Sequence, residues 1–162
     1  MCMNPQHIQN TLTRKSSRIL GKYPVLFAYL YGSFATGVVH PFSDVDIGIY
    51  VQEVAEGGYL ALELGISLEF DEELTGNVQS DLRVINDLPL SFLGQIVTDG
   101  VLVYCIDDVT RIDFETSVRM AYFDFLPVLK MHQNEYLNRA LGRGDEMHQP
   151  ILYRATRGAL AE

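Results

Sequence analysis

The twenty residues from Tyr31 to Tyr50 constrain this chain more than any other stretch. They read YGSFATGVVHPFSDVDIGIY, in which Gly32-Ser33 is followed, after a spacer of ten residues, by Asp44-x-Asp46. Side chains two apart on a strand project from the same face, because they alternate with a period of two. Two such carboxylates can hold a divalent cation such as Mg²⁺ against the phosphates of a nucleotide. The glycine lets backbone amides and the serine hydroxyl come close to those phosphates, so the stretch contains the parts needed for nucleotidyl transfer.

Buried strands are predicted on both sides of this spacer. The run VLFAYLY over 25–31 has the length and composition of a buried strand, and Gly32 ends it. Ser33 is well placed to begin a short helix. Residues 44–51 then alternate as a second strand, with apolar side chains on one face and the two carboxylates on the other. We expect the small Gly48 to keep the carboxylate face open.

Other elements follow from periodicity and from Gly and Pro positions. The predicted elements are a helix over 6–21, strands over 78–85 and 101–105, a helix over 89–99 and helical structure over 108–141. Pro127 should kink the last helical region or split it in two.

The segment 58–76 gives conflicting signals. Its large apolar residues alternate strictly from Leu60 to Phe70, which predicts a strand. Its length, its content of Leu, Ala and Glu and the glycine at position 76 favour a helix instead.

The charge distribution is more informative than the net charge of −9. After Lys22, no Lys or Arg occurs until Arg83, and the interval between them is rich in Asp and Glu. Such a surface repels a phosphate backbone, because nucleic-acid binding normally depends on Lys and Arg. We therefore expect no direct nucleic-acid partner, and we expect a nucleoside triphosphate to approach only with metal.

The length of 162 residues and the hydrophobic content of 48% fit one domain with a single core. We expect a domain over 1–141, with its core over 22–106 and C-terminal helices over 108–141, followed by a flexible tail over 142–162. The sequence shows no signal peptide and no apolar stretch of the ~18–20 residues that a membrane span needs. Two cysteines, Cys2 and Cys105, fit a reduced cytoplasmic protein.

Four aromatic residues, Tyr122, Phe123, Phe125 and Tyr136, lie in the C-terminal helical region. They fit either ordinary core packing or a face that binds a partner. Core packing is the preferred interpretation for a small domain.

The Gly32-Ser33 pair and Asp44-x-Asp46 at this spacing resemble the signature of the DNA polymerase β-like nucleotidyltransferase superfamily. Over roughly residues 20–140, the chain most resembles its minimal MntA-type members, the antitoxin partners of HEPN-domain toxins. The resemblance implies the small nucleotidyltransferase fold, an α/β (α+β) architecture. In this fold a mixed sheet of about four strands is flanked by helices and followed by a C-terminal helical segment. It also favours the helix over 58–76.

Polymerase-type chemistry uses a third carboxylate, for which Asp81 is the candidate. It lies in a predicted strand, as Asp-Leu-Arg-Val, where the superfamily has an aspartate. The 35 residues that separate it from Asp46 leave room for one crossover helix between adjacent strands. Asp87 is the competitor, but Asn86 and Pro89 beside it predict a turn.

The resemblance implies a metal-dependent transfer of AMP from ATP. Asp44 and Asp46 would bridge two Mg²⁺ ions, Asp81 would ligate one of them, and Gly32 and Ser33 would grip the β- and γ-phosphates. In the MntA-type group, the acceptor is a hydroxyl of the cognate HEPN ribonuclease toxin. Two alternatives stay open: a small-molecule nucleotidyltransferase of aminoglycoside type, and an antitoxin that acts by binding alone.

Overall fold

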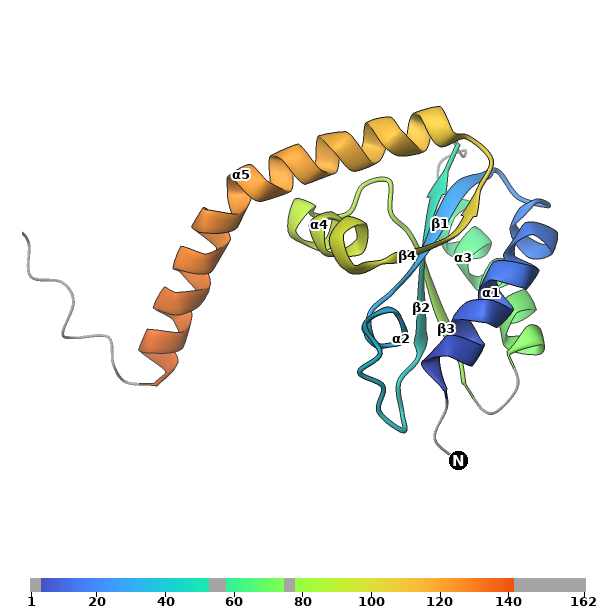
Figure 1. Cartoon of the computed structure of the whole chain (residues 1–162), viewed down its shortest axis with the longest axis horizontal. Coiled ribbons are helices and arrows are strands. Elements are labelled where there is room, and N and C mark those ends of the chain that lie inside the picture. The colour runs from blue at the N-terminus through green and yellow to red at the C-terminus, as the bar shows by residue number, and fades with distance from the viewer. Residues whose placement is uncertain (1–3, 53–57, 75–77, 142–162) are drawn as a thin grey trace, which may run out of the picture. The chain divides into compact units, whose positions relative to one another are not determined.

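A computed structural model describes residues 4–52, 58–74 and 78–141 of the chain. Its elements, in chain order, are α1 (Pro5–Leu20), β1 (Val25–Tyr31), α2 (Ser33–Thr36), β2 (Val45–Val51), α3 (Gly58–Glu73), β3 (Ser80–Val84), α4 (Leu90–Asp99), β4 (Val101–Cys105) and α5 (Asp108–Ala140) (Figure 1). The chain divides into two compact units, Met1–Phe123 and Asp124–Glu162, and α5 runs from the first into the second.

The strands form one mixed sheet in the order β3-β2-β1-β4. β1 pairs antiparallel with both β2 and β4, whereas β2 and β3 are parallel. Two parallel strands need a crossover connection, and α3 provides it. The predicted fold class, a mixed four-stranded sheet flanked by helices with a C-terminal helix, is confirmed.

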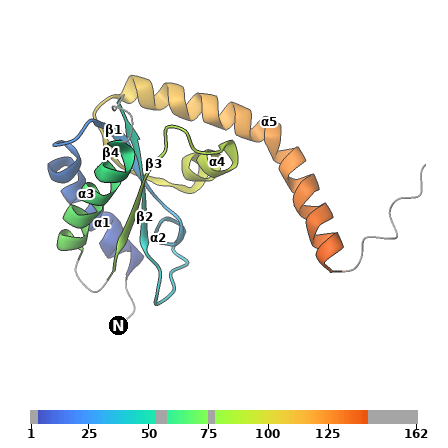
Figure 2. The same ribbon diagram turned by 180° about the vertical axis from the view of Figure 1, so that it is seen from behind.

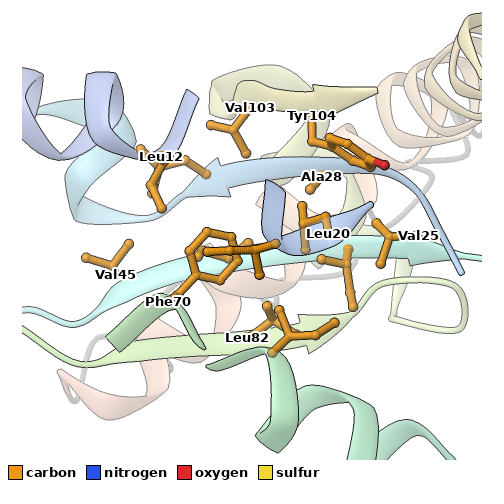
Figure 3. Packing of buried hydrophobic residues seen from close by; sticks show 14 of the residues in the cluster. Leu12, Leu20, Val25, Ala28, Val45, Phe70, Leu82, Val103 and Tyr104 are labelled. Carbon is orange, nitrogen blue, oxygen red and sulfur yellow. The ribbon is translucent and has the colours of Figure 1, made fainter. Parts of the chain in front are cut away.

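One face of the sheet is covered by α1 and α3, which lie on the same side of it (Figure 1 and Figure 2). Leu12 of α1 and Phe70 of α3 pack there against strand residues such as Val45 and Leu82 (Figure 3). Leu12, Phe70 and Val45 are fully buried. Each such side chain contributes about 1.5–3 kcal/mol through burial, so this face supplies much of the stability of the fold.

The opposite face is covered by α4 and by the first turns of α5. Its buried cluster joins Phe27 and Tyr29 of β1 to Ile96 of α4 and Val118 of α5. The aromatic rings of Phe27 and Tyr50 stack with their centroids 4.6 Å apart. This cover does not extend to the end of the sheet where β1 finishes, because Asp46 and Asp81 there are only half-buried.

The conflict over residues 58–76 is resolved in favour of the helix, because α3 spans Gly58–Glu73. α5 is one continuous helix with Pro127 inside it, so the predicted split does not occur. The expected tail over 142–162 lies outside the described residues. In the part of the chain that is described, no helix is long and apolar enough to cross a bilayer.

The four aromatic residues of the C-terminal region do not share one environment. Tyr122 is half-buried within the first unit. Phe123, Phe125 and Tyr136 are 56%, 38% and 74% exposed. The preferred interpretation as core residues is therefore wrong for these three.

Candidate active site

Two of the three predicted carboxylates face one another across adjacent strands. Asp46 of β2 and Asp81 of β3 are register partners in the parallel pair, so their side chains project from the same face of the sheet. Asp44 comes one residue before β2 and is exposed. The pKa of Asp46 is raised, first by partial burial and then by the negative charges of Asp81 and Asp44. The three carboxylates therefore form one electrostatically coupled group.

Gly32 gives the Asp46 carboxylate its space. A Cβ at position 32 would lie 2.2 Å from Oδ2 of Asp46, far inside contact distance. Gly32 also has a φ of +68°, a conformation that residues with a Cβ rarely adopt. Close approach and backbone geometry both require glycine at this position.

Ser33 follows Gly32 directly as the first residue of α2. This short helix is closed by Gly37, whose amide donates to the Ser33 carbonyl at 2.9 Å and whose φ is +82°. The tight connection leaves β1 at the point where Tyr31 pairs with Asp46. The structure thus brings Gly32, Asp46 and Asp81 together, couples Asp44 to them by charge, and places Ser33 beside Gly32 in the chain.

Tyr31 and Arg83, which were not predicted from the sequence, also belong to this group. The pKa of Tyr31 is raised to about 12, first by burial and then by the charges of Asp46 and Asp81. Arg83 forms an ion pair with Asp81 at 3.3 Å. Period two along β3 places Arg83 on the same face as Asp81, so the strand prediction contained a signal for it. For Tyr31, the signal in the sequence was its position as the last residue of the predicted strand, directly before Gly32.

Comparison with known proteins identifies the superfamily. Residues 14–109, more than half of the chain, match the family described as "Polymerase beta, Nucleotidyltransferase". The chain belongs to this family. The predicted superfamily is therefore confirmed, and the carboxylates on β2 and β3 lie within the matched residues.

Solved structures share the fold of this nucleotidyltransferase. A chain of a toxin–antitoxin crystal structure with AMP-PNP aligns with a TM-score of 0.57 and 15% identity, over 80% of this chain and 98% of that one. A chain from the complex of tri-AMPylated Shewanella oneidensis HEPN toxin with MNT antitoxin aligns with a TM-score of 0.53 and 15% identity, over 82% and 98%. No curated protein matches the sequence significantly. At these identities the structural matches show a common fold.

Gly48 does not keep the carboxylate face of the nucleotidyltransferase open, contrary to the expectation from sequence. A Cβ at this position would lie 2.8 Å from Cγ2 of Ile85 and 3.6 Å from Cδ1 of Ile96. Ile85 and, from α4, Ile96 pack directly onto Gly48, so position 48 has no room for a side chain. The accessible part of this face next to Asp46 therefore does not extend over Gly48, which is buried.

A hollow of about 300 Å³ lies beside Gly32, between α2 and α4. Its walls include Tyr31, Phe92 and Gln95. The rings of Tyr31 and Phe92 meet edge to face, with their centroids 5.5 Å apart. An aromatic wall with a nearby amide has the chemistry to receive a planar heterocycle.

The donor set of the site fits Mg²⁺. No group of three or more His, Cys, Asp or Glu side chains forms a preassembled cage among the described residues. Mg²⁺ seldom needs one, because it is usually held by one or two carboxylates together with waters and substrate phosphates. Asp46, Asp81 and Asp44 supply oxygen ligands only, and their mutual repulsion is what a bound cation would relieve. These three residues could hold the metal.

Asp87, the alternative candidate for the third carboxylate, is not a register partner of Asp46 and lies outside β3. It is exposed in the turn that follows β3. Its neighbour Asn86 holds the end of β2, accepting from the Val51 amide at 3.0 Å and donating to the Val51 carbonyl at 2.8 Å. Asp87 therefore serves as a matched control for the site carboxylates.

Proposed function

We propose that this nucleotidyltransferase moves AMP from ATP to a hydroxyl of a partner protein, a HEPN-domain toxin, and acts as its antitoxin. The observation that carries the proposal is the registered pair Asp46–Asp81, with Gly32 packed against the Asp46 carboxylate. The fold shared with a chain from a tri-AMPylated HEPN toxin–antitoxin complex supports the choice of donor and acceptor.

In this proposal Asp44, Asp46 and Asp81 hold two Mg²⁺ ions. Bound metal would neutralise charge on the triphosphate and lower the pKa of the acceptor hydroxyl. Asp81 has a second task, since a carboxylate can take the proton that the acceptor hydroxyl loses. Arg83 pairs with Asp81 at 3.3 Å and so orients its carboxylate.

The nucleotide would lie across the turn that follows β1. The amides around Gly32 and the Ser33 hydroxyl donate to the β- and γ-phosphates, and the base enters the hollow beside Tyr31 and Phe92. The acceptor oxygen forms a bond to the α-phosphorus as the bond to the bridging oxygen breaks. Pyrophosphate leaves, and AMP stays on the acceptor. Catalysis then consists mainly of positioning and charge neutralisation.

A protein acceptor suits the charge of the chain. The interval without Lys or Arg between Lys22 and Arg83 disfavours a nucleic-acid acceptor. We further propose a cytoplasmic location, which the presence of only two cysteines supports.

Labelling tests this proposal. The purified protein is incubated with Mg²⁺ and α-labelled ATP beside the product of its neighbouring gene, tested as the HEPN-domain acceptor. We expect label on that protein with the wild type and with Asp87→Asn, and none with Asp46→Asn. Transfer by a folded Asp46→Asn variant at the wild-type rate would contradict the assignment.

Neutralisation by binding alone is the second candidate, and exposed apolar side chains on the helix of the second unit favour it. Met131, Tyr136 and Leu137 are 59%, 74% and 53% exposed, which suits a docking surface. Toxin neutralisation in cells by the wild type and by Asp44→Ala/Asp46→Ala separates the two functions. Equal protection by the double variant would mean that binding is sufficient.

A further inference from the structure

α3 has two opposite apolar faces. Successive helical residues are 100° apart, so residues two apart project in nearly opposite directions and residues four apart share a face. The strict alternation from Leu60 to Phe70 therefore builds two rows. The inner row packs on the sheet, with Ile66 and Phe70 fully buried and Leu62 partly buried. The outer row consists of Leu60, Leu64 and Leu68, which are 66%, 58% and 65% exposed.

The outer row is unnecessary for folding. An amphipathic helix that covers a sheet needs one apolar stripe, and its opposite face is normally polar. Three leucines, each one turn from the next, instead form a continuous exposed apolar strip on α3. A strip of this kind marks a surface that another molecule covers.

This strip borders a groove of about 550 Å³ between α3 and the edge strand β3. Two carboxylates of α3 bind the backbone of β3 along it. Glu63 accepts from the Val84 amide at 2.8 Å, and Asp71 accepts from the Ser80 amide at 2.7 Å. These amides are therefore not free to pair with an added strand. Strand addition along β3 is therefore disfavoured, and we expect an occupant of the groove to bind mainly through its side chains.

The groove also reaches the candidate active site and is acidic. Asp81 and Arg83 of β3 line it together with the leucines of α3. Its charged lining is Glu63, Asp71 and Asp81 against the single guanidinium of Arg83, so it favours a positively charged occupant. A chain lying in this groove would pass along the edge of the sheet that carries Asp81, the residue that we assign to the acceptor hydroxyl.

We propose that the groove between α3 and β3 is the docking site for the acceptor protein, and that it binds a segment carrying both apolar residues and Lys or Arg. The apolar residues cover Leu60, Leu64 and Leu68, and the cations pair with Glu63 and Asp71. This arrangement brings a hydroxyl of the segment to Asp81. The inference rests on the proposed function for the identity of the acceptor, whereas the groove and its charge come from the geometry.

Binding and transfer are measured separately to test the groove. The full-length protein, as wild type or as Leu64→Glu/Leu68→Glu, is titrated by calorimetry with the product of its neighbouring gene, tested as the HEPN-domain acceptor, at low and high salt. The matched control is Val109→Glu/Ile112→Glu on α5, where the two side chains are 72% and 51% exposed. Labelling with α-labelled ATP at varied acceptor concentration then gives KM and kcat for the acceptor. Leu64→Ala/Leu68→Ala serves as a milder second variant, and circular dichroism verifies that all four proteins are folded.

We expect Leu64→Glu/Leu68→Glu to weaken binding and to raise the acceptor KM at least about tenfold, with the KM for ATP unchanged. The control should match the wild type, and binding should weaken with salt. Unchanged acceptor binding by both groove variants would overturn the proposal. So would an absence of binding by the wild type, or a self-association that the groove variant alone loses. Binding that depends on the leucines without any transfer of label would support the groove and contradict the proposed function.

Discussion

The two faces of the sheet differ in how completely helices cover them, and β2 contributes to both. On the face under α1 and α3, β2 presents Val45, Ile47 and Ile49, which are all fully buried. On the opposite face it presents Gly48, onto which α4 packs, and Asp46, which is half-buried. Period-two alternation thus lets one strand anchor the core and carry the site. The candidate site lies where the apolar cover of the second face ends.

The largest effect is expected at the open end of the second face. Asp46→Asn should reduce AMP transfer by roughly 10³-fold or more, because it removes a ligand of the metal. Bound metal would contribute several kcal/mol by stabilising the charge of the transition state. The melting temperature should stay equal or rise, since the substitution removes a partly buried charge that Asp81 and Asp44 repel. Labelling kinetics and thermal unfolding test both parts. A large loss of stability would mean that Asp46 is a structural residue.

The second prediction concerns the fully covered face. Ile47→Ala should lower the free energy of unfolding by about 2–5 kcal/mol, because it leaves a cavity beneath α1 and α3. Urea denaturation measures the loss, and the protein that stays folded should still transfer AMP. A loss below about 1 kcal/mol would contradict the dense packing of this face.

The two glycines of the second face should respond differently to a methyl group. Gly48→Ala should destabilise the fold by about 1–3 kcal/mol through overpacking against Ile85. Gly32→Ala should also lower stability, because a φ of +68° is strained for alanine. It should in addition abolish transfer, since its Cβ would displace the Asp46 carboxylate, whereas folded Gly48→Ala should still transfer AMP. Unfolding and labelling of both variants test the difference. The same phenotype in both would remove the distinction between the covered and the open half.

A smaller, pH-dependent effect is expected in the covered half. Partial burial raises the pKa of Glu115, but hydrogen bonds from Tyr29 and Arg111 outweigh it and hold this pKa below 4.5. The resulting stabilisation is present above the unfolded pKa and is lost as the pH falls through the lower folded pKa. Between about pH 6 and pH 3, the wild type should therefore lose more stability than Glu115→Gln. Parallel denaturation curves for the two proteins would contradict this.

The smallest effect is expected for the surface ion pair of the site. Arg83 and Asp81 are 55% and 44% exposed in their side chains, so Arg83→Gln should change stability by less than about 1 kcal/mol. Chemical denaturation measures the change. A loss above about 2 kcal/mol would mean that the pair holds the edge strand in place.

Much of the fold followed from local signals in the sequence. The apolar run of β1, the alternation of β2 and the glycines near element ends predicted these elements close to their observed bounds. The spacing of Asp46 and Asp81 left room for a crossover helix between adjacent strands, and their register in the parallel pair agrees with it. These features were predictable because each depends on short-range periodicity or on the length of a single connection.

Other features depend on tertiary contacts that the sequence did not reveal. The alternation in α3 suggested a strand because a helix with two apolar faces produces the same pattern, and only packing distinguishes its buried row from its exposed row. Gly48 was expected to open the face, yet Ile85 and Ile96 pack onto it. The exposure of Phe123 and Tyr136 likewise depends on which residues pack against α5, which periodicity does not encode.

Nucleotide binding by the wild type and two variants tests most directly whether the end of the sheet that carries Asp46 is the active site. The wild type, Asp46→Asn and Asp87→Asn are titrated with AMP-PNP and Mg²⁺ in a calorimeter. We predict equal affinity for the wild type and Asp87→Asn, and affinity at least about tenfold lower for Asp46→Asn, because Asp46, unlike Asp87, is proposed to share the metal with the phosphates. Equal binding by all three proteins would contradict the account and would place the nucleotide elsewhere on the molecule.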